Sequence, residues 1–128
     1  MKVQFRKPDL TTLLPDEAAF VSPAQMSLSP GRDYVVYAIS VFDKVAFVQI
    51  VDDKDTPVFL PRALFEMVVA DIPNDWICTI FPAGPVQLVL GPTYVAKDID
   101  SYNAMIDQEA AQVERFWRRV ASDTDGAR

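Results

Sequence analysis

The feature that most constrains this chain is a pair of apolar segments, residues 34–42 and 45–51, joined by Asp43 and Lys44. Both segments are rich in β-branched and aromatic residues, and each is apolar on both of its alternating faces. Strands of this kind are buried on both sides, and a two-residue connection closes an antiparallel hairpin. The sequence therefore predicts a central hairpin that other parts of the chain must cover.

Short apolar segments separated by turn residues follow the hairpin. The expected strands are residues 57–60, 65–70, 76–81 and 86–90, and the intervening turns contain Pro, Gly or Asp. Short strands at regular spacing are typical of a small barrel or sandwich. We expect about six antiparallel strands in all.

The hydrophobic pattern changes its period toward the C-terminus, where we expect two helices. Asp100 or Ser101 is expected to cap the first helix, which runs to about Asp107. The second helix is expected over about residues 108–121. An apolar stripe on that helix is expected to face the strands. The stripe consists of Ala110, Val113, Trp117 and Val120, with Phe116 flanking it.

At 128 residues the chain is expected to form a single domain. Residues 1–32 are interpreted as an N-terminal arm that includes one short strand, residues 33–95 as a β-barrel, and residues 98–121 as C-terminal helices. The expected fold class is α+β and mainly β, with a small antiparallel barrel of about six strands followed by two helices.

The chain carries a formal net charge of −6. Affinity for nucleic acids comes largely from Lys and Arg side chains that neutralise phosphates, so the composition argues against a nucleic-acid partner and against an anionic membrane surface. It permits a basic protein partner, although solubility alone also explains such a charge.

Two residue types narrow the possible chemistry. The chain has no His, which removes the commonest general base and the commonest transition-metal ligand. Its single cysteine, Cys78, lies in an apolar run and is expected to be a buried thiol rather than a nucleophile. We expect no enzymatic activity, no cofactor and no metal.

The chain shows no segment suited to crossing a membrane. Its longest uncharged run, residues 76–96, contains three prolines and two glycines. Residues 1–7 lack the apolar core of a signal peptide. We therefore expect a cytoplasmic protein without a membrane partner.

Asp52, Asp53 and Asp55 resemble the first ligands of a calcium-binding loop. An EF-hand requires a Gly at the sixth position and a Glu at the twelfth, between two helices. Counted from Asp52, these positions are Pro57 and Ala63. The segment is therefore expected to be an acidic turn between strands.

Two other clusters are expected to be structural. The aromatic residues of the strands could form a stacking platform for single-stranded nucleic acid, but their acidic neighbours favour a place in the core. These residues are Tyr34, Tyr37, Phe42, Phe47, Phe59, Phe65 and Trp76. Arg115, Arg118 and Arg119 could form a binding patch beside Trp117, but we expect them instead near a helix C-terminus, where the helix dipole favours cations, with Trp117 buried.

The central stretch also resembles a group of small bacterial proteins. The similarity consists of a Gly-x-x-Tyr-x-Val-Tyr-x-Ile strand, a second strand ending in Asp-Asp, and the motifs Pro-x-x-Leu-Phe-Glu and Ile-Pro-x-x-Trp. It covers about residues 31–120. The matching residues are Gly31, Tyr34, Val36, Tyr37, Ile39, Asp52, Asp53, Pro61, Leu64, Phe65, Glu66, Ile72, Pro73 and Trp76. That group has an SH3-like barrel followed by C-terminal helices, and it resembles the immunity proteins encoded beside antibacterial toxins.

The resemblance implies an immunity protein that binds a cognate toxin domain and neutralises it by occlusion. An acidic chain suits a basic toxin domain, because complementary charge steers association. The candidate partner-binding residues are the acids on turns and before helices, each of which could equally be a plain solvated turn residue. They are Asp43, Asp52, Asp53, Asp55, Asp71, Asp75, Asp98 and Asp100.

The sequence is also compatible with two other classes of protein. One is an SH3-like regulatory module that binds a peptide and has no connection with toxins. The other is a small enzyme of unrecognised type that depends on a carboxylate such as Asp53.

Overall fold

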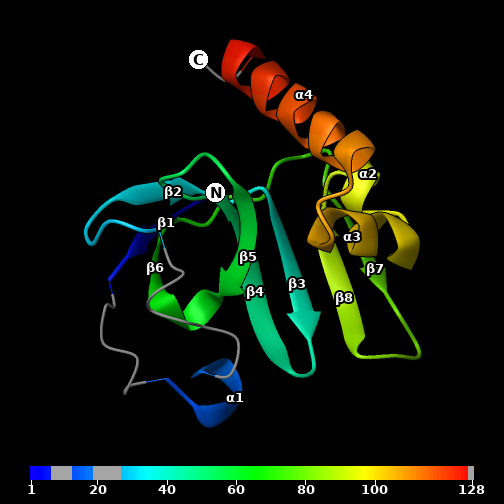
Figure 1. The fold of residues 1–128 in the computed structure, drawn as a ribbon, viewed down its shortest axis with the longest axis horizontal. Helices are drawn as coiled ribbons and strands as arrows, with labels where there is room; N and C mark the ends of the chain where they lie inside the picture. Colours follow the sequence, from blue (N-terminus) through cyan, green and yellow to red (C-terminus); the bar gives the residue numbers. More distant parts are fainter. Residues whose placement is uncertain (7–12, 19–26, 127–128) are drawn as a thin grey trace.

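The computed structural model describes residues 1–6, 13–18 and 27–126 of the chain and shows an α+β fold that consists mainly of strands (Figure 1). The strands are β1 (Lys2–Phe5), β2 (Asp33–Val35), β3 (Ala38–Phe42), β4 (Val45–Val51), β5 (Pro57–Pro61), β6 (Phe65–Val69), β7 (Ile77–Ile80) and β8 (Val86–Gly91). The helices are α1 (Pro15–Ala18), the 3-10 helix η2 (Arg62–Leu64), α2 (Thr93–Ala96), α3 (Ile99–Ile106) and α4 (Ala110–Gly126). Much of the predicted N-terminal arm, residues 7–12 and 19–26, lies outside the described residues.

The described strands form two antiparallel sheets. One has three strands in the order β2-β1-β6, and the other has five in the order β5-β4-β3-β8-β7. The predicted central hairpin is confirmed, because β3 pairs with β4 from Ala38 opposite Gln49 to Phe42 opposite Val45. The turn residue Asp43 has φ 50° and the next residue has φ 69°. Two positive φ angles in a two-residue loop are typical of a type I′ turn, whose twist suits a hairpin.

The prediction of one continuous strand over residues 34–42 is wrong. β2 and β3 belong to different sheets, and the chain changes sheet between Val36 and Tyr37. The amide of Val36 donates to the carbonyl of Met1 at 3.0 Å, whereas the amide of Tyr37 donates to the carbonyl of Gln49 at 2.8 Å. The run of β-branched and aromatic residues does not reveal this change, because both halves of it are strand.

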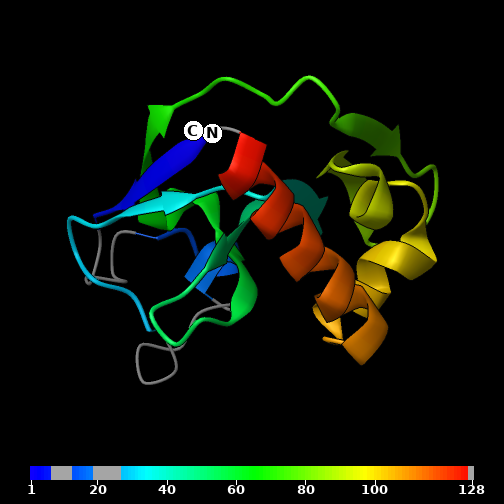
Figure 2. The ribbon, with the colours of Figure 1, turned by 90° about the horizontal axis from the view of Figure 1, so that it is seen from above.

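The five-stranded sheet is the middle of three layers (Figure 2). On one face, the β4 residues Val48 and Ile50 pack in a core with the three-stranded sheet and η2. On the other face, the β3 and β8 residues pack against α2, α3 and α4 in a second core that contains Tyr102 and Phe116. Four successive β4 residues, 47–50, are buried, which confirms that this strand is covered on both sides.

The first predicted C-terminal helix is confirmed with a different cap. The carboxylate of Asp98, rather than that of Asp100, accepts the amide of Ser101 at 2.8 Å, so α3 begins at Ile99. The short helix α2, which joins β8 to α3, was not predicted. The C-terminal part of the described chain therefore contains three helices where two were expected.

Half of the predicted apolar stripe on α4 is confirmed, because Val113 and Val120 pack against the second core, whereas Ala110 and Trp117 are exposed. Phe116 is fully buried, while Trp117 is 37% exposed. Gln112 occupies the buried position one turn earlier and is 2% exposed. Its amide group donates to the carbonyls of Tyr94 at 2.7 Å and Ser101 at 3.0 Å, which allows a polar side chain at a core position. The apolar pattern could not identify this residue.

The three arginines of α4 also differ from expectation. The helix continues to Gly126, so Arg115, Arg118 and Arg119 lie in its middle rather than near its end. Arg118 pairs with Glu114 one turn away, and Arg119 is largely buried. Among the helices described, none is both long and apolar enough to cross a membrane.

Phe116 is expected to be the main residue that attaches α4 to the sheet. Its ring lies 5.1 Å from the ring of Tyr37, centroid to centroid, and has no exposed surface. Phe116→Ala should lower the free energy of unfolding by about 3–5 kcal/mol, because it removes a large buried side chain and leaves a cavity. Chemical denaturation measures the change. The control is Trp117→Ala, which should cost clearly less, and equal losses for the two variants would contradict the packing described.

Candidate functional site

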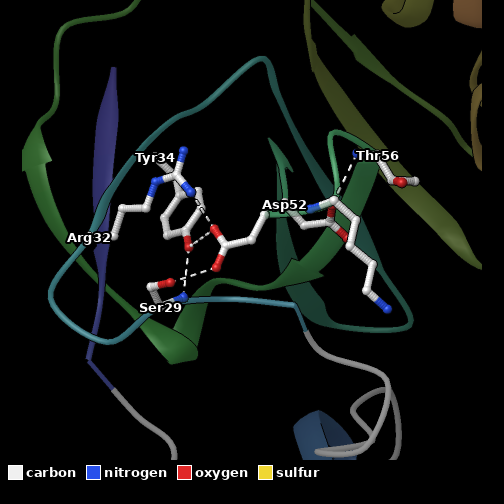
Figure 3. A network of polar contacts seen from close by, with 7 residues as sticks. Ser29, Arg32, Tyr34, Asp52 and Thr56 are labelled. Carbon is white, nitrogen blue, oxygen red and sulfur yellow. Dashed lines mark hydrogen bonds and ion pairs between the residues drawn. The ribbon is translucent and has the colours of Figure 1, made fainter.

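The acidic turn after β4 is tied to the segment before β2 through Asp53 (Figure 3). One carboxylate oxygen of Asp53 accepts the hydroxyl of Tyr34 at 2.8 Å and pairs with the guanidinium of Arg32. The other accepts the hydroxyl of Ser29 at 2.6 Å. The amide of Ser29 in turn donates to the Tyr34 hydroxyl at 2.8 Å. We call these four residues the Asp53 network.

The Asp53 network perturbs the protonation of its own members. The hydroxyl of Ser29, together with Tyr34 and Arg32, holds the pKa of Asp53 below its usual value of 3.8. Burial, and then the neighbouring carboxylate of Asp53, raises the pKa of Tyr34. Both carboxylate oxygens of Asp53 already accept hydrogen bonds from this chain. The carboxylate therefore connects the two sheets and is not free to bind another protein.

Asp52 stabilises the turn in which it lies. One of its carboxylate oxygens accepts the amides of Lys54 at 2.9 Å and Thr56 at 3.0 Å (Figure 3). This is the usual way in which an aspartate closes a loop. Within the described residues, no three acidic or cysteine side chains converge as metal ligands would.

A second ionic cluster attaches α4 to the segment between β6 and β7. We call this segment, residues 70–76, the arch, because it spans the distance between the two sheets in Figure 2. Two nitrogens of Arg119 donate to the two carboxylate oxygens of Asp75 at 2.6 and 2.8 Å. The third donates to Asp123 at 2.8 Å. The hydrogen bonds from Arg119 hold the pKa of Asp75 below its usual value.

A cleft of about 250 Å³ lies between the arch, α4 and the end of β2. Trp76 of the arch and Tyr37 provide aromatic surface, and Arg119 provides a charged group. Nearby, the buried hydroxyl of Tyr94 has no hydrogen-bond partner in the described part of the chain. Burial raises the pKa of this phenol. The cleft is thus apolar along most of its wall, and one of its two cationic lining residues, Arg119, is already paired with acids of the protein.

Large apolar side chains are exposed on both sides of the arch. We use the name arch face for the exposed apolar residues at the end of β6, in the arch and on β7, which are Val68 (48% exposed), Val69 (39%), Ile72 (50%), Ile77 (37%) and Ile80 (74%). It ends on β6 and β7, which are edge strands of the two sheets. Cys78 is exposed on the same edge strand, so the prediction of a buried thiol is wrong. An apolar run predicts a strand but does not show which strand lies at an edge.

The structure divides the eight predicted aspartates into two equal groups. In the first group the carboxylate already has a partner in the protein. These are Asp52, Asp53, Asp75 and Asp98. In the second group the residue is exposed, and its carboxylate has no hydrogen bond or ion pair within the described residues. These are Asp43, Asp55, Asp71 and Asp100.

The residues that hold the first group in place were not predicted as part of any site. Ser29, Arg32 and Tyr34 are far from Asp53 in sequence, and Arg119 is far from Asp75. Two cases carried a local signal. Asp52 accepts the amides of residues two and four positions ahead, as turn aspartates do, and Asp98 lies three residues before Ser101 in the spacing of a helix cap.

Comparison with models of protein families, with curated proteins and with solved structures gave no match to this chain.

The Asp53 network is expected to contribute measurably to stability. Asp53→Asn should lower the free energy of unfolding near neutral pH by about 1–2 kcal/mol, an effect moderated by partial solvent exposure. Because the folded pKa of Asp53 is lowered, its contribution is present above the unfolded pKa and is lost as the pH falls through the folded value. The loss should therefore shrink in acid.

The matched control is Asp55→Asn, two residues further along the same turn. Asp55 is exposed and has φ 60°, a conformation that Asn tolerates well. Its substitution should leave the free energy of unfolding nearly unchanged in urea titrations. Equal effects of the two substitutions would exclude the proposed role of the network.

Proposed function

We propose that this chain is an immunity protein that binds a basic antibacterial toxin domain and neutralises it by occlusion. The observation that carries the proposal is the arch face, whose exposed apolar side chains lie on two edge strands and on the arch between them, which also carries an exposed acid, Asp71. Protein interfaces commonly have an apolar centre with polar residues around it.

The charge of the chain supports a basic partner. The net charge is −6, and four of the eight candidate aspartates have carboxylates without a partner within the described residues. Asp71 lies in the arch itself, next to Ile72 of the arch face. Acids elsewhere on the surface strengthen the attraction at long range, which accelerates association more than it tightens the final complex.

The proposed relationship also extends to the fold. We interpret the two sheets as a variant of an SH3-like barrel in which the segment from β2 to β3 passes from one sheet to the other. Strands that bend from one sheet into a second are the usual corners of small barrels and orthogonal sandwiches. The antiparallel pairing of every strand in both sheets supports this interpretation.

A peptide-binding regulatory module is the second candidate, and the position of β7 favours it. β7 pairs only with β8 among the described strands, so one of its edges is available for an added strand. Peptides commonly bind by extending a sheet in this manner. A pull-down would favour this second function if it recovered a housekeeping protein that binds through a peptide segment, and if no toxin competed for the same site.

The proposal predicts that the product of the neighbouring gene is toxic and forms a complex with this chain. In that complex, Ile72→Glu should weaken binding by about tenfold or more, because it places a charge in the apolar centre of the interface. Asp71→Lys should slow association and reduce its dependence on salt. Surface plasmon resonance at several ionic strengths measures both effects.

The control is Ile99→Glu, since Ile99 is also exposed, at 36%, but lies on α3 away from the arch. The Ile99→Glu variant should bind the toxin with the same affinity as the unaltered chain. Failure of the neighbouring product to be toxic or to co-purify would overturn the immunity function, and equal weakening by both substitutions would exclude the arch face as the contact.

A further inference from the structure

The two sheets have four edge strands among the described residues, and one of them, β7, differs from the other three. β2 contains Asp33, β6 contains Glu66, and β5 begins and ends with a proline. Charged residues and prolines are common means by which proteins prevent an edge strand from pairing with another chain. β7 has the sequence Ile77-Cys-Thr-Ile80 and contains neither. It therefore lacks the protection that the other three edges have.

β7 also lies where another chain can reach it. It is at the outer margin of the fold in both views (Figures 1 and 2) and pairs only with β8 among the described strands. Cys78 is exposed, and the side chain of Ile80 is 74% exposed. A large apolar side chain with so little cover gains free energy when a partner removes it from water.

The backbone of β7 presents hydrogen-bonding groups along its free edge. The amide of Phe81 donates to the carbonyl of Gln87 at 2.9 Å. Successive residues of an antiparallel strand direct their amides and carbonyls to alternate sides. The groups of Thr79 therefore point toward β8, as those of Phe81 do, whereas the amides and carbonyls of Cys78 and Ile80 point toward the free edge.

These outward groups fit a second copy of the same strand. When two β7 strands run antiparallel with Thr79 opposite its own copy, Cys78 of each strand lies opposite Ile80 of the other. Residues that face each other in this way exchange both of their backbone hydrogen bonds. Every outward amide and carbonyl of the two β7 strands is then paired.

The neighbouring registers pair fewer of these groups. Moving the centre of the pairing one residue toward the C-terminus brings Pro82 opposite Cys78, and proline has no N–H to donate. Moving it one residue toward the N-terminus brings Trp76 opposite Ile80, but the amide of Trp76 already donates to the carbonyl of Pro73 at 3.2 Å. The backbone therefore favours the register centred on residue 79.

We propose that this chain forms a symmetric dimer in which two copies of β7 pair antiparallel about Thr79. The exposed side chain of Ile80 then packs beside Cys78 of the second copy, because directly opposite residues share a face of the sheet. The dimer joins the two five-stranded sheets into one continuous sheet.

The distribution of charge favours a second copy over a basic protein at this edge. Each chain carries a net charge of −6, but residues 76–96 contain no charged side chain, so two copies meet here without like charges opposite each other. A basic partner is recognised through acids, and β7 has none. A toxin bound at the arch face would compete with the dimer, because Ile80 belongs to both surfaces. The dimer itself is tested on the chain alone.

Sedimentation velocity of the chain should show an equilibrium between monomer and dimer. The dimer should become tighter as salt is added, because salt screens the repulsion between two acidic copies. Ile80→Lys should weaken the dimer about tenfold or more, since it places a hydrated charge at the paired edge. This variant should remain folded, because the side chain of Ile80 is largely exposed. The control is Ile106→Lys on α3, at a residue that is 45% exposed, and it should dimerise like the unaltered chain.

Cross-linking tests the register. In a chain that carries both Thr79→Cys and Cys78→Ser, the two thiols lie on the two-fold axis, where Cα atoms are about 4.5 Å apart, within the range of about 4.4–6.8 Å that a disulfide spans. Oxidation with diamide should yield a disulfide-linked dimer on non-reducing gels. The unaltered chain should cross-link poorly, because its two Cys78 residues are diagonal neighbours about 7–8 Å apart.

Three results would each overturn the proposed dimer. The first is a chain that stays monomeric at about 1 mM, which would leave the β7 edge to the peptide of the second candidate function. The second is equal weakening of the dimer by Ile80→Lys and Ile106→Lys. The third is cross-linking of the Thr79→Cys, Cys78→Ser chain that is no more efficient than that of the unaltered chain.

Discussion

The adjacent amides of Val36 and Tyr37 donate to two different sheets, and the rest of the fold depends on this division. The first binds the carbonyl of Met1 beside β1, and the second binds the carbonyl of Gln49 in β4. The side chain of Val36 is buried in the core between the sheets, while the ring of Tyr37 packs against Phe116 of α4. Two neighbouring residues therefore join three layers.

Local patterns in the sequence predicted the strands well, because β-branched residues, prolines and a two-residue turn act over short distances. The hairpin, the strand beginning at Phe65 and the strand beginning at Val86 all follow from such signals. The bend at Val36 does not follow from local signals, because it depends on which sheet each half of residues 34–42 joins. Whether a strand lies at an edge is equally invisible locally, which is why Cys78 was expected to be buried.

The candidate site was less predictable than the fold. Charge and turn composition identified eight aspartates, but a hydrogen bond such as that from Ser29 to Asp53 joins residues that are distant in sequence. Gln112 shows the same limit in the core, because its amide donates to one carbonyl of α2 and one of α3. The apolar pattern predicts that a glutamine is exposed, whereas the folded chain buries it by pairing its amide group.

The separation of the aspartates into those held by the protein and those left exposed is central to the functional proposal. It is tested most directly by following each carboxyl carbon through a pH titration by NMR. Asp53, Asp75 and Asp98 should each titrate below the usual value of 3.8, because donors in the protein stabilise their charged forms. A midpoint for Asp53 or Asp75 at or above about 3.9 would show that these carboxylates are not held by the protein, and would contradict the account.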